Sequence, residues 1–353
     1  MSLIEDAIIA LQPPILPFAI SFFMRLLSKL LLITFILAAV LAWIALRPLP
    51  MQTDPAAFSV PSGASLRRAA QAIEAVGIDM PAWQFELLGR LLGRATRIKA
   101  GSYEIAGQTT ALQLLDKLTR GEVSQGKLVL VEGRTFAEFR ALLNETPDLL
   151  HESRDLQNAA LLARIGAQES SPEGLFFPDT YWYDKNSSDL ALLARAYHAM
   201  QRRLDTAWAA RDPGLPLKTP YDMLILASIV EKETGLASDR PQIAAVFVNR
   251  LRIGMPLQTD PTVIYGLGAR FDGNLRRIDL QMDTPWNTYT RRGLPPTPIA
   301  LPGLAALQAA ANPPPSDKLY FVAQGAAGTG ASVFSRSLEE HNRAVAKHQK
   351  GQK

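Results

Sequence analysis

From Tyr221 to Thr234 the sequence reads YDMLILASIVEKET, an apolar run that ends in two glutamates and is followed by Gly235. The run predicts a helix, and a glycine after it is a typical C-terminal stop. Apolar residues precede Glu233 by seven, four and three positions, so Glu233 continues the apolar line of this helix. Glu231 lies roughly 200° further round the axis, so only one of the two carboxylates can point into a given cleft.

The position of Glu233 suggests chemistry, and a second interpretation competes with it. A carboxylate at the end of a buried line loses solvation, which raises its pKa and makes it a general acid at neutral pH. In the competing interpretation, Glu233 is a surface residue at a fraying helix end and pairs with Lys232 or Arg240. The helix by itself leaves both interpretations open.

The segments on either side of this helix predict further helices. Leu149 to Arg211 is rich in Ala and Leu and is interrupted by the aromatic segment Glu173–Tyr183. Pro241 to Leu251 predicts another helix, in which we interpret Arg250 as a buried ion-pair residue.

Near the C-terminus the sequence predicts a hairpin. Leu319–Val322 and Ser332–Phe334 are short strand-like runs that flank Gly325-Ala-Ala-Gly-Thr-Gly330. The glycine segment lacks the Lys-Ser/Thr of a phosphate-binding loop, so we interpret it as the turn between the two strands.

A hydrophobic segment near the N-terminus predicts a membrane anchor. Leu26 to Leu46 reads LLSKLLLITFILAAVLAWIAL, and about 20 such residues span the hydrocarbon core of a bilayer. Lys29 and Trp43 suit the two interfaces of the membrane. A cleavable signal peptide is the alternative, but the run is longer than a usual signal and no Ala-x-Ala-like site follows it.

The charges around this segment predict its orientation. Arg25 and Lys29 lie at its start and Arg47 follows its end, which favours a cytoplasmic N-terminus and an exported remainder. Residues 1–25 then form a cytoplasmic leader, residues 26–46 the transmembrane helix and residues 47–57 a linker. Because Met24-Arg25 begins a conventional signal anchor, Met24 is an alternative translation start.

Residues 58–143 carry a local pattern that recurs three times: an extended apolar residue, then Gly-x-Ser/Thr, then a helical run. It appears as Val60-Pro-Ser-Gly63-Ala-Ser65-Leu66, Ile105-Ala-Gly107-Gln-Thr109 and Val131-Glu-Gly133-Arg-Thr135-Phe136. The glycine makes the turn, and the Ser65, Thr109 or Thr135 hydroxyl caps the next helix. The pattern predicts a small α+β module that resembles the carbohydrate-binding LysM-like βααβ unit of cell-wall proteins. A strand–turn–helix unit without a ligand is the alternative.

Composition excludes several kinds of site. The chain has no cysteine, which excludes thiolate zinc sites, iron–sulfur clusters, catalytic thiols and disulfides. Its four histidines lack metal-ligand spacing, and no G-x-S-x-G is present. A net charge of +4 without a long basic run does not favour nucleic-acid binding. Carboxylates remain as the candidates for chemistry, and we expect no metal, cofactor or nucleic-acid partner.

Polar and aromatic residues in turns follow the helix that ends at Glu233. They form the segments Gln258-Thr-Asp-Pro-Thr-Val-Ile-Tyr265-Gly266, Asn287-Thr-Tyr289 and Gly293-Leu-Pro-Pro-Thr-Pro-Ile-Ala300. Together with Ala227-Ser-Ile-Val-Glu231-Lys-Glu233-Thr234 and Val248-Asn-Arg-Leu251, they closely resemble the endolytic murein transglycosylases of the MltG/YceG-like family. Glu173–Tyr181 and Leu338-Glu-Glu-His341-Asn342 match as well, so the resemblance runs from about Val60 to Asn342. The family often has a histidine before the Phe of the last strand, where this chain has Ser332-Val333-Phe334.

The resemblance implies a catalytic domain over residues 144–353 and an overall α+β fold with a lysozyme-like catalytic helix. It further implies cleavage of the β-1,4 bond from N-acetylmuramic acid to N-acetylglucosamine without water. Glu233 would protonate the leaving oxygen and then deprotonate the C6 hydroxyl, which closes a 1,6-anhydro ring. Glu231 is the fallback for this role and is otherwise a buttress or hydrogen-bond partner.

The resemblance also suggests which residues hold the sugar and where the protein works. The candidates for substrate binding are Gln258, Thr259, Asp260, Tyr265, Asn287 and Tyr289. For each, capping a turn or satisfying the core is the alternative, and Asp260 would support a hydrolytic muramidase if water can enter. The expected partners are peptidoglycan glycan strands, the cell membrane and peptidoglycan synthases, with the domain periplasmic and the anchor in the inner membrane. The rival class is a non-catalytic wall-binding scaffold.

Overall fold

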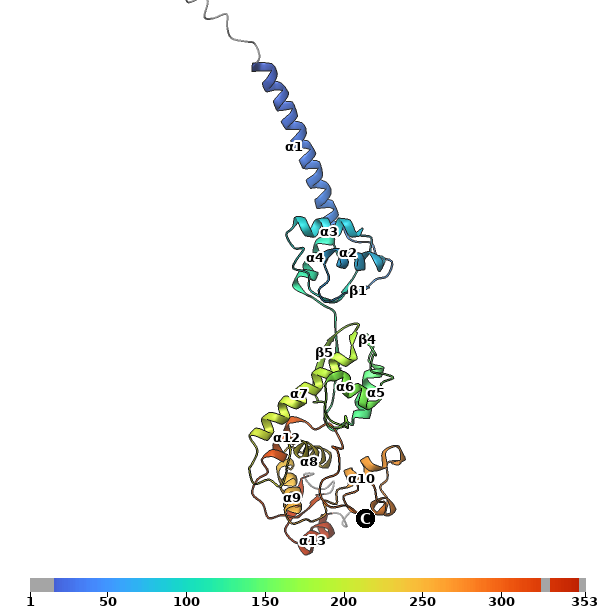
Figure 1. Cartoon of the computed structure of the whole chain (residues 1–353), viewed down its shortest axis with the longest axis vertical. Coiled ribbons are helices and arrows are strands. Elements are labelled where there is room, and N and C mark those ends of the chain that lie inside the picture. The colour runs from blue at the N-terminus through green and yellow to red at the C-terminus, as the bar shows by residue number, and fades with distance from the viewer. Residues whose placement is uncertain (1–15, 325–330, 349–353) are drawn as a thin grey trace, which may run out of the picture. The chain divides into compact units, whose positions relative to one another are not determined.

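Helices and short two-stranded sheets make up the computed structural model, which describes residues 16–324 and 331–348 (Figure 1). The mixed α+β class predicted from the sequence is confirmed. The chain divides into two units, residues 1–125 and residues 126–353, each with its own hydrophobic core. Most of the predicted leader, residues 1–15, and the predicted glycine turn, residues 325–330, lie outside the described residues.

Helix α1 (Leu16–Leu46) contains the predicted anchor. Its segment Phe22–Leu46 is long and apolar enough to cross a membrane, and only 6% of its most apolar window is buried. The C-terminal end of α1 is different, because Ala45 and Ile44 pack against the core of the first unit. The helix therefore ends on the module that follows it.

The remainder of the first unit is a strand–helix–helix–strand arrangement followed by one more helix. Its elements are β1 (Ala56–Val60), α2 (Leu66–Ala75), α3 (Ala82–Leu91), β2 (Gly101–Ile105) and α4 (Ala111–Arg120). Strands β1 and β2 are antiparallel, with Ala56 opposite Ile105. The buried faces of the three helices pack on this pair of strands.

The predicted helix caps are correct at two of the three repeats. The Ser65 hydroxyl accepts a hydrogen bond from the Arg68 N–H, and Thr135 forms a capping box at α5 (Phe136–Glu145). At the second repeat the prediction of Thr109 is wrong by one residue, because Thr110 caps α4. Thr109 donates to the Ala106 carbonyl at 2.7 Å and so closes the turn instead.

The second unit begins with short strands and helices that surround an aromatic core. They are β3 (Gln125–Val129), α5, β4 (Leu149–Leu150), α6 (Asn158–Ile165), β5 (Thr180–Asp184), β6 (Ser187–Ser188) and α7 (Asp189–Ala209). Strand β3 pairs with β5, and β4 pairs in parallel with β6. Phe136, Phe139 and Leu143 of α5 lie in the core of the second unit. Residues 126–143 therefore pack with this unit.

The rest of the second unit surrounds the apolar helix quoted at the start. The elements are α8 (Pro220–Glu233), α9 (Arg240–Arg252), α10 (Asp260–Leu267), η2 (Gly268–Arg270), α11 (Arg277–Gln281), α12 (Leu304–Ala311), β7 (Tyr320–Ala323), β8 (Ser332–Ser335) and α13 (Leu338–His348). Strands β7 and β8 form the predicted hairpin, with Tyr320 opposite Ser335.

Helix α8 is the central helix of this unit. It packs against α7, α9, α10 and α12, and every residue from Met223 to Val230 is buried. A capping box between Thr219 and Asp222 starts the helix, with Pro220 in its first turn. The helix ends at Glu233, because Thr234 is extended. The end of a buried helix thus presents one carboxylate to the residues around it.

Candidate active site

A cavity of about 350 Å³ lies at the C-terminal end of α8. Its described lining residues come from α8, α9, α10, α13, β7 and two connecting segments: Glu233, Arg250, Gln258, Asp260, Tyr289, Tyr320, Phe321, Leu338 and His341. Four of the residues predicted from the sequence are therefore brought together around one space. They are Glu233, Gln258, Asp260 and Tyr289.

Glu233 has the protonation behaviour of a general acid. Burial at the end of α8 raises its pKa to about 7, and the nearby negative charge of Asp260 adds to this rise. The Thr259 hydroxyl, which donates a hydrogen bond to Glu233 Oε1, and the Arg250 cation both act in the opposite direction. The carboxyl group can therefore exist in either protonation state near neutral pH.

The competing interpretation, in which Glu233 pairs with Lys232 or Arg240 at the surface, is wrong. Lys232 Nζ donates to the Gly133 carbonyl at 3.1 Å. Arg240 pairs with the other glutamate, Glu231, at 3.2 Å. Both cations are thus engaged elsewhere.

The contacts of Glu231 hold the structure together. Its side chain is only 5% exposed, and one carboxylate oxygen forms the ion pair with Arg240. The other oxygen accepts a hydrogen bond from the Gly303 N–H at 3.0 Å, at the start of α12. A Cβ at position 303 would lie 1.8 Å from an oxygen of the exposed Glu132 side chain, so that side chain would have to move if position 303 were not glycine. Glu231 therefore fastens the end of α8 to the start of α12.

The segment before α10 has an unusual backbone conformation at Gln258. This non-glycine residue has φ +47°, in the left-handed region, and such strained positions are frequent at functional sites. Hydrogen bonds to Thr288 hold the conformation: Gln258 N donates to its carbonyl at 3.1 Å, and Thr259 N donates to its hydroxyl at 3.1 Å. The Gln258 side chain is exposed and lines the cavity.

Asp260 and Tyr289 form a hydrogen-bonded pair in the cavity wall. The Tyr289 hydroxyl donates to Asp260 Oδ1 at 2.5 Å. Burial raises the pKa of Tyr289, and the adjacent Asp260 raises it further, so the phenol stays protonated and remains a donor. The pair gives the site a second carboxylate whose orientation is fixed by the phenol.

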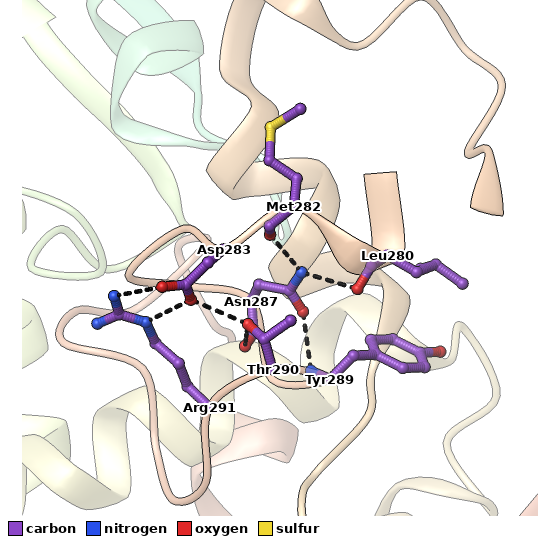
Figure 2. A network of polar contacts seen from close by, with 7 residues as sticks. All are labelled: Leu280, Met282, Asp283, Asn287, Tyr289, Thr290 and Arg291. Carbon is purple, nitrogen blue, oxygen red and sulfur yellow. Dashed lines mark hydrogen bonds and ion pairs between the residues drawn. The ribbon is translucent and has the colours of Figure 1, made fainter. Parts of the chain in front are cut away.

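Asn287 shapes the loop and does not line the cavity (Figure 2). It is fully buried, and its side-chain nitrogen donates to the carbonyls of Leu280 at 3.1 Å and Met282 at 2.7 Å. Its side-chain oxygen accepts from the Tyr289 N–H at 2.8 Å. The side-chain amide of Asn287 is therefore hydrogen-bonded to main-chain groups. This arrangement fits the alternative role considered from the sequence, in which the residue caps a turn, better than it fits substrate binding.

We expect Asn287→Ala to lower the free energy of unfolding by about 3 kcal/mol, because three buried main-chain groups lose their partners. Arg291→Ala is the matched control in the same loop. It removes an ion pair with Asp283 whose side chains are 53% and 60% exposed, so its cost should be much smaller than that of Asn287→Ala. Urea denaturation of the full chain in detergent measures both, and equal losses would contradict the role given to Asn287.

Tyr265 lies apart from the residues that line the cavity. It follows Asp260 by five positions on α10, so it lies about 140° away around the helix axis. Its hydroxyl donates to Glu173 Oε2 at 3.1 Å, and Glu173 Oε1 accepts from the Phe136 N–H at 2.9 Å. Burial raises the pKa of Glu173 to about 7. Tyr265 therefore fixes α10 to a second buried carboxylate.

The sequence did not single out Arg250 as a site residue. It is 7% exposed, and instead of the predicted ion pair it donates from Nε to the Leu319 carbonyl at 2.7 Å and from Nη1 to the Leu257 carbonyl at 2.5 Å. These bonds hold its cation in the cavity wall, where it favours the charged form of Glu233. The only signal was that Arg250 lies in the segment Val248–Leu251, which matches the family.

The aromatic wall of the cavity was also missed. The His341 ring stacks on Tyr320 with centroids 5.4 Å apart, and burial together with Arg250 lowers the pKa of His341. Phe321 and Leu338 complete this wall. The only signal was the match of the Leu338–Asn342 segment to the family. Among the described residues, no group of three or more His, Asp or Glu side chains is placed to hold a metal ion.

The hydrogen bond from Thr259 gives a prediction about pH dependence. Removing it in Thr259→Val should raise the pKa of Glu233 further, because that bond stabilises the carboxylate. A general acid works in its protonated form, so the alkaline limb of kcat/KM should move upward by about one pH unit. Thr262→Val is the control, since Thr262 bonds to Thr259 and Thr288 but not to Glu233. A limb that moves equally in both variants, or downward in Thr259→Val, would contradict the assignment.

Comparisons with known proteins agree with this architecture. A model of the YceG-like family matches residues 58–347. The endolytic murein transglycosylase of Bacillus subtilis (strain 168) is 38% identical over 176 residues, which are 50% of this chain and 48% of that protein. The endolytic murein transglycosylase of Streptococcus pneumoniae serotype 2 is 28% identical over 325 residues, which are 82% of this chain and 57% of that protein. The chain thus spans about half the length of these relatives.

A solved structure has the same fold. The crystal structure of a yceG-like protein from Listeria monocytogenes matches with a TM-score of 0.51 and 28% sequence identity, over 83% of this chain and 100% of that one. The family model covers nearly all of the chain outside its N-terminal helix, including every residue that lines the cavity. The chain therefore belongs to the YceG-like family.

Proposed function

We propose that this protein is a membrane-anchored endolytic lytic transglycosylase of peptidoglycan. It would cleave the β-1,4 bond between N-acetylmuramic acid and N-acetylglucosamine in nascent strands and leave 1,6-anhydro ends, which terminates strand elongation. The observation that carries the proposal is a single carboxyl group, Glu233, with a pKa of about 7 in a cavity lined by polar and aromatic side chains. Relatives named endolytic murein transglycosylase support it.

The proposed reaction needs one group that acts first as acid and then as base. Protonated Glu233 gives its proton to the bridging oxygen as the bond from C1 to that oxygen breaks. The Glu233 carboxylate then takes the proton of the C6 hydroxyl while O6 bonds to C1. The attacking hydroxyl belongs to the same sugar, so the step gains the advantage of an intramolecular reaction. No water is consumed, and Glu233 returns to its starting state.

The neighbours of Glu233 have supporting parts in this scheme. Arg250 stabilises the carboxylate that exists between the two proton transfers. The Asp260 carboxylate, oriented by Tyr289, is suited to face the positive charge that develops at C1. Gln258 and the aromatic wall of Tyr320 and His341 provide hydrogen-bonding groups and ring surface for the sugar.

Hydrolysis by a muramidase is the second candidate for the chemistry. It is favoured by the presence of Asp260, because ordinary glycosidases use two carboxylates. The hydrogen bond from Tyr289 occupies one oxygen of Asp260, so only the other oxygen is free to accept a proton from water. This contact favours the reaction that needs one acid/base group. A scaffold without activity is disfavoured by the raised pKa of Glu233 within a cavity.

Mass spectrometry of the products distinguishes these possibilities. Uncrosslinked glycan is digested by the full chain in detergent, in parallel with Glu233→Gln. We expect termini that are lighter by one water than reducing ends, and none with the variant. Reducing termini would identify a hydrolase and direct attention to Asp260, and no cleavage with intact glycan binding would favour the scaffold.

We also propose that the strand–helix–helix–strand part of the first unit is a LysM-like module that binds glycan. The order β1, α2, α3, β2 and a groove lined by residues between Ala64 and Ile98 support this. Deleting residues 56–124 should weaken binding to glycan polymer without changing which bond is cut. The deletion stops before residue 126, because α5 contributes to the core of the second unit. Sedimentation with insoluble glycan measures binding, and unchanged binding would reject the module as a glycan-binding unit.

The anchor would keep the enzyme where new strands are made. We propose a single pass of α1 through the inner membrane, with a cytoplasmic N-terminus, a periplasmic catalytic domain and peptidoglycan synthases as neighbours. The exposed apolar segment Phe22–Leu46, with Arg25 and Lys29 near its start, supports this topology.

A further inference from the structure

One face of α3 is apolar and exposed. Its residues, called here the α3 stripe, are Trp83, Leu87 and Leu91, with 64%, 40% and 60% of each exposed. They recur every four positions, so they follow one side of the helix. Phe85 and Leu88, on the opposite side, are buried in the core of the first unit. The α3 stripe is therefore an unpartnered face of an amphipathic helix.

The start of α3 is fastened to the end of α1. Arg47, directly after α1, forms an ion pair with Asp79 at 3.5 Å and donates to the Asp79 carbonyl at 3.3 Å. Asp79 precedes the first residue of α3 by only three positions, and α1 and α3 pack against each other. Any membrane that α1 crosses must end close to Arg47, because the apolar segment ends at Leu46. The start of α3 therefore lies at the depth of the headgroups.

The chemistry of the α3 stripe suits that depth. Trp83 on α3 and Trp43 on α1 are 64% and 62% exposed, and tryptophan concentrates at the interface of a bilayer. Arg47 packs over the Trp43 ring at 4.8 Å, which anchors a cation at the same level. Arg90 of α3 forms an ion pair with Glu86 at 2.6 Å, and its side chain is 67% exposed, so its guanidinium is accessible to anionic headgroups beside the leucines. Leucines, a tryptophan and an arginine on one short helix are typical of interfacial helices.

We propose that the α3 stripe inserts into the headgroup region of the bilayer that α1 crosses. The first unit is then docked on the lipid surface and held at a fixed orientation, in addition to being tethered through α1. This inference rests on the proposed membrane anchoring of α1 and goes beyond it, since the anchor alone requires no contact between α3 and lipid.

The absence of cysteine allows a direct test, because each introduced cysteine is the only one in the chain. The full-length protein is reconstituted in vesicles of phosphatidylethanolamine and phosphatidylglycerol and labelled with an environment-sensitive fluorophore. Three sites are compared: Leu87→Cys in the α3 stripe, Leu37→Cys in α1 and Glu122→Cys on an exposed loop of the first unit. Lipids that carry a nitroxide close to the headgroup serve as quenchers for Leu87→Cys and Glu122→Cys, and lipids that carry it on the acyl chain near the middle of the bilayer serve for Leu37→Cys.

We expect the Leu87→Cys label to have blue-shifted emission, and we expect nitroxide lipids to quench most of its fluorescence intensity. The fluorescence of the Glu122→Cys label should not be quenched. Adding Trp83→Ser and Leu91→Ser should abolish quenching at Leu87→Cys, whereas Gln71→Ser on α2 should not. All three substitutions replace exposed side chains, so the fold should persist.

The remaining outcomes contradict the inference in distinguishable ways. If the Leu37→Cys label is quenched and the Leu87→Cys label is not, the proposed contact between the α3 stripe and lipid is overturned. The proposed anchoring by α1 is then still supported. Blue-shifted emission at Leu87→Cys that nitroxide lipids do not quench means that a protein surface covers the α3 stripe, which also overturns the inference. If neither label reports contact with lipid, the proposed anchoring itself has failed.

Discussion

Glu233→Gln should lower kcat on uncrosslinked glycan by about 10³-fold or more, because the substitution removes the only group proposed to give and take protons. Glutamine has nearly the same shape and can still accept the hydrogen bond from Thr259. Binding of glycan should therefore be retained. Kinetics of product release from a labelled glycan, with binding measured separately, would detect this separation of catalysis from affinity.

The same substitution should change how stability depends on pH. The pKa of Glu233 is about 7 in the folded protein, against 4.5 ordinarily, so folding favours the protonated form. The preference of the folded protein for protonated Glu233 leaves the free energy of unfolding at its full value below the pKa that Glu233 has in the unfolded chain. This contribution is lost as the pH rises through 7. At alkaline pH the loss amounts to about 3 kcal/mol. Glu233→Gln should thus be more stable than the wild type at alkaline pH and about equally stable at low pH.

Glu173 has to be considered in that measurement. Its pKa is also raised to about 7 by burial, so some decrease in stability at alkaline pH should persist in Glu233→Gln. Urea denaturation at several pH values measures both contributions. A variant that keeps wild-type kcat would exclude Glu233 as the acid/base, and a variant with the full wild-type pH slope would exclude burial as the cause of its raised pKa.

Glu231→Ala should have the opposite effect: a large loss of stability with catalysis preserved in the molecules that remain folded. The substitution leaves Arg240, whose side chain is only 12% exposed, without its ion-pair partner. It also removes the acceptor for the Gly303 N–H at the start of α12. Removing one member of a buried pair costs about 3 kcal/mol or more.

A double variant provides the control for this prediction. Glu231→Met combined with Arg240→Leu replaces the pair by apolar side chains of similar size, and it should recover part of the lost stability. Denaturation and kcat are measured for the single and double variants alongside Glu233→Gln. If Glu231→Ala unfolds normally but loses kcat by as much as Glu233→Gln, the roles of the two glutamates must be exchanged.

Local features of the fold could be predicted because they depend on neighbouring residues. The apolar run and the glycine after Thr234 predict α8 within a residue of its observed ends. Ser65 and Thr135 cap helices as expected for the same reason. The apolar segment of α1 follows from hydropathy alone. Where two hydroxyls were adjacent, as at Thr109 and Thr110, the sequence could not choose between them.

Helix periodicity predicted Glu233, and the family resemblance supplied the other three predicted residues that line the cavity, Gln258, Asp260 and Tyr289. The sequence by itself determined that Glu233 continues the buried line of α8 and that Glu231 faces elsewhere. Only the tertiary structure decided what each carboxylate meets: Thr259 and Arg250 for Glu233, and Gly303, far along the chain, for Glu231. The physical reason is that loop side chains have no fixed period. Asn287 turns inward to main-chain groups, while Tyr289, two residues later, reaches the cavity, and this difference depends on tertiary contacts that the sequence does not encode locally.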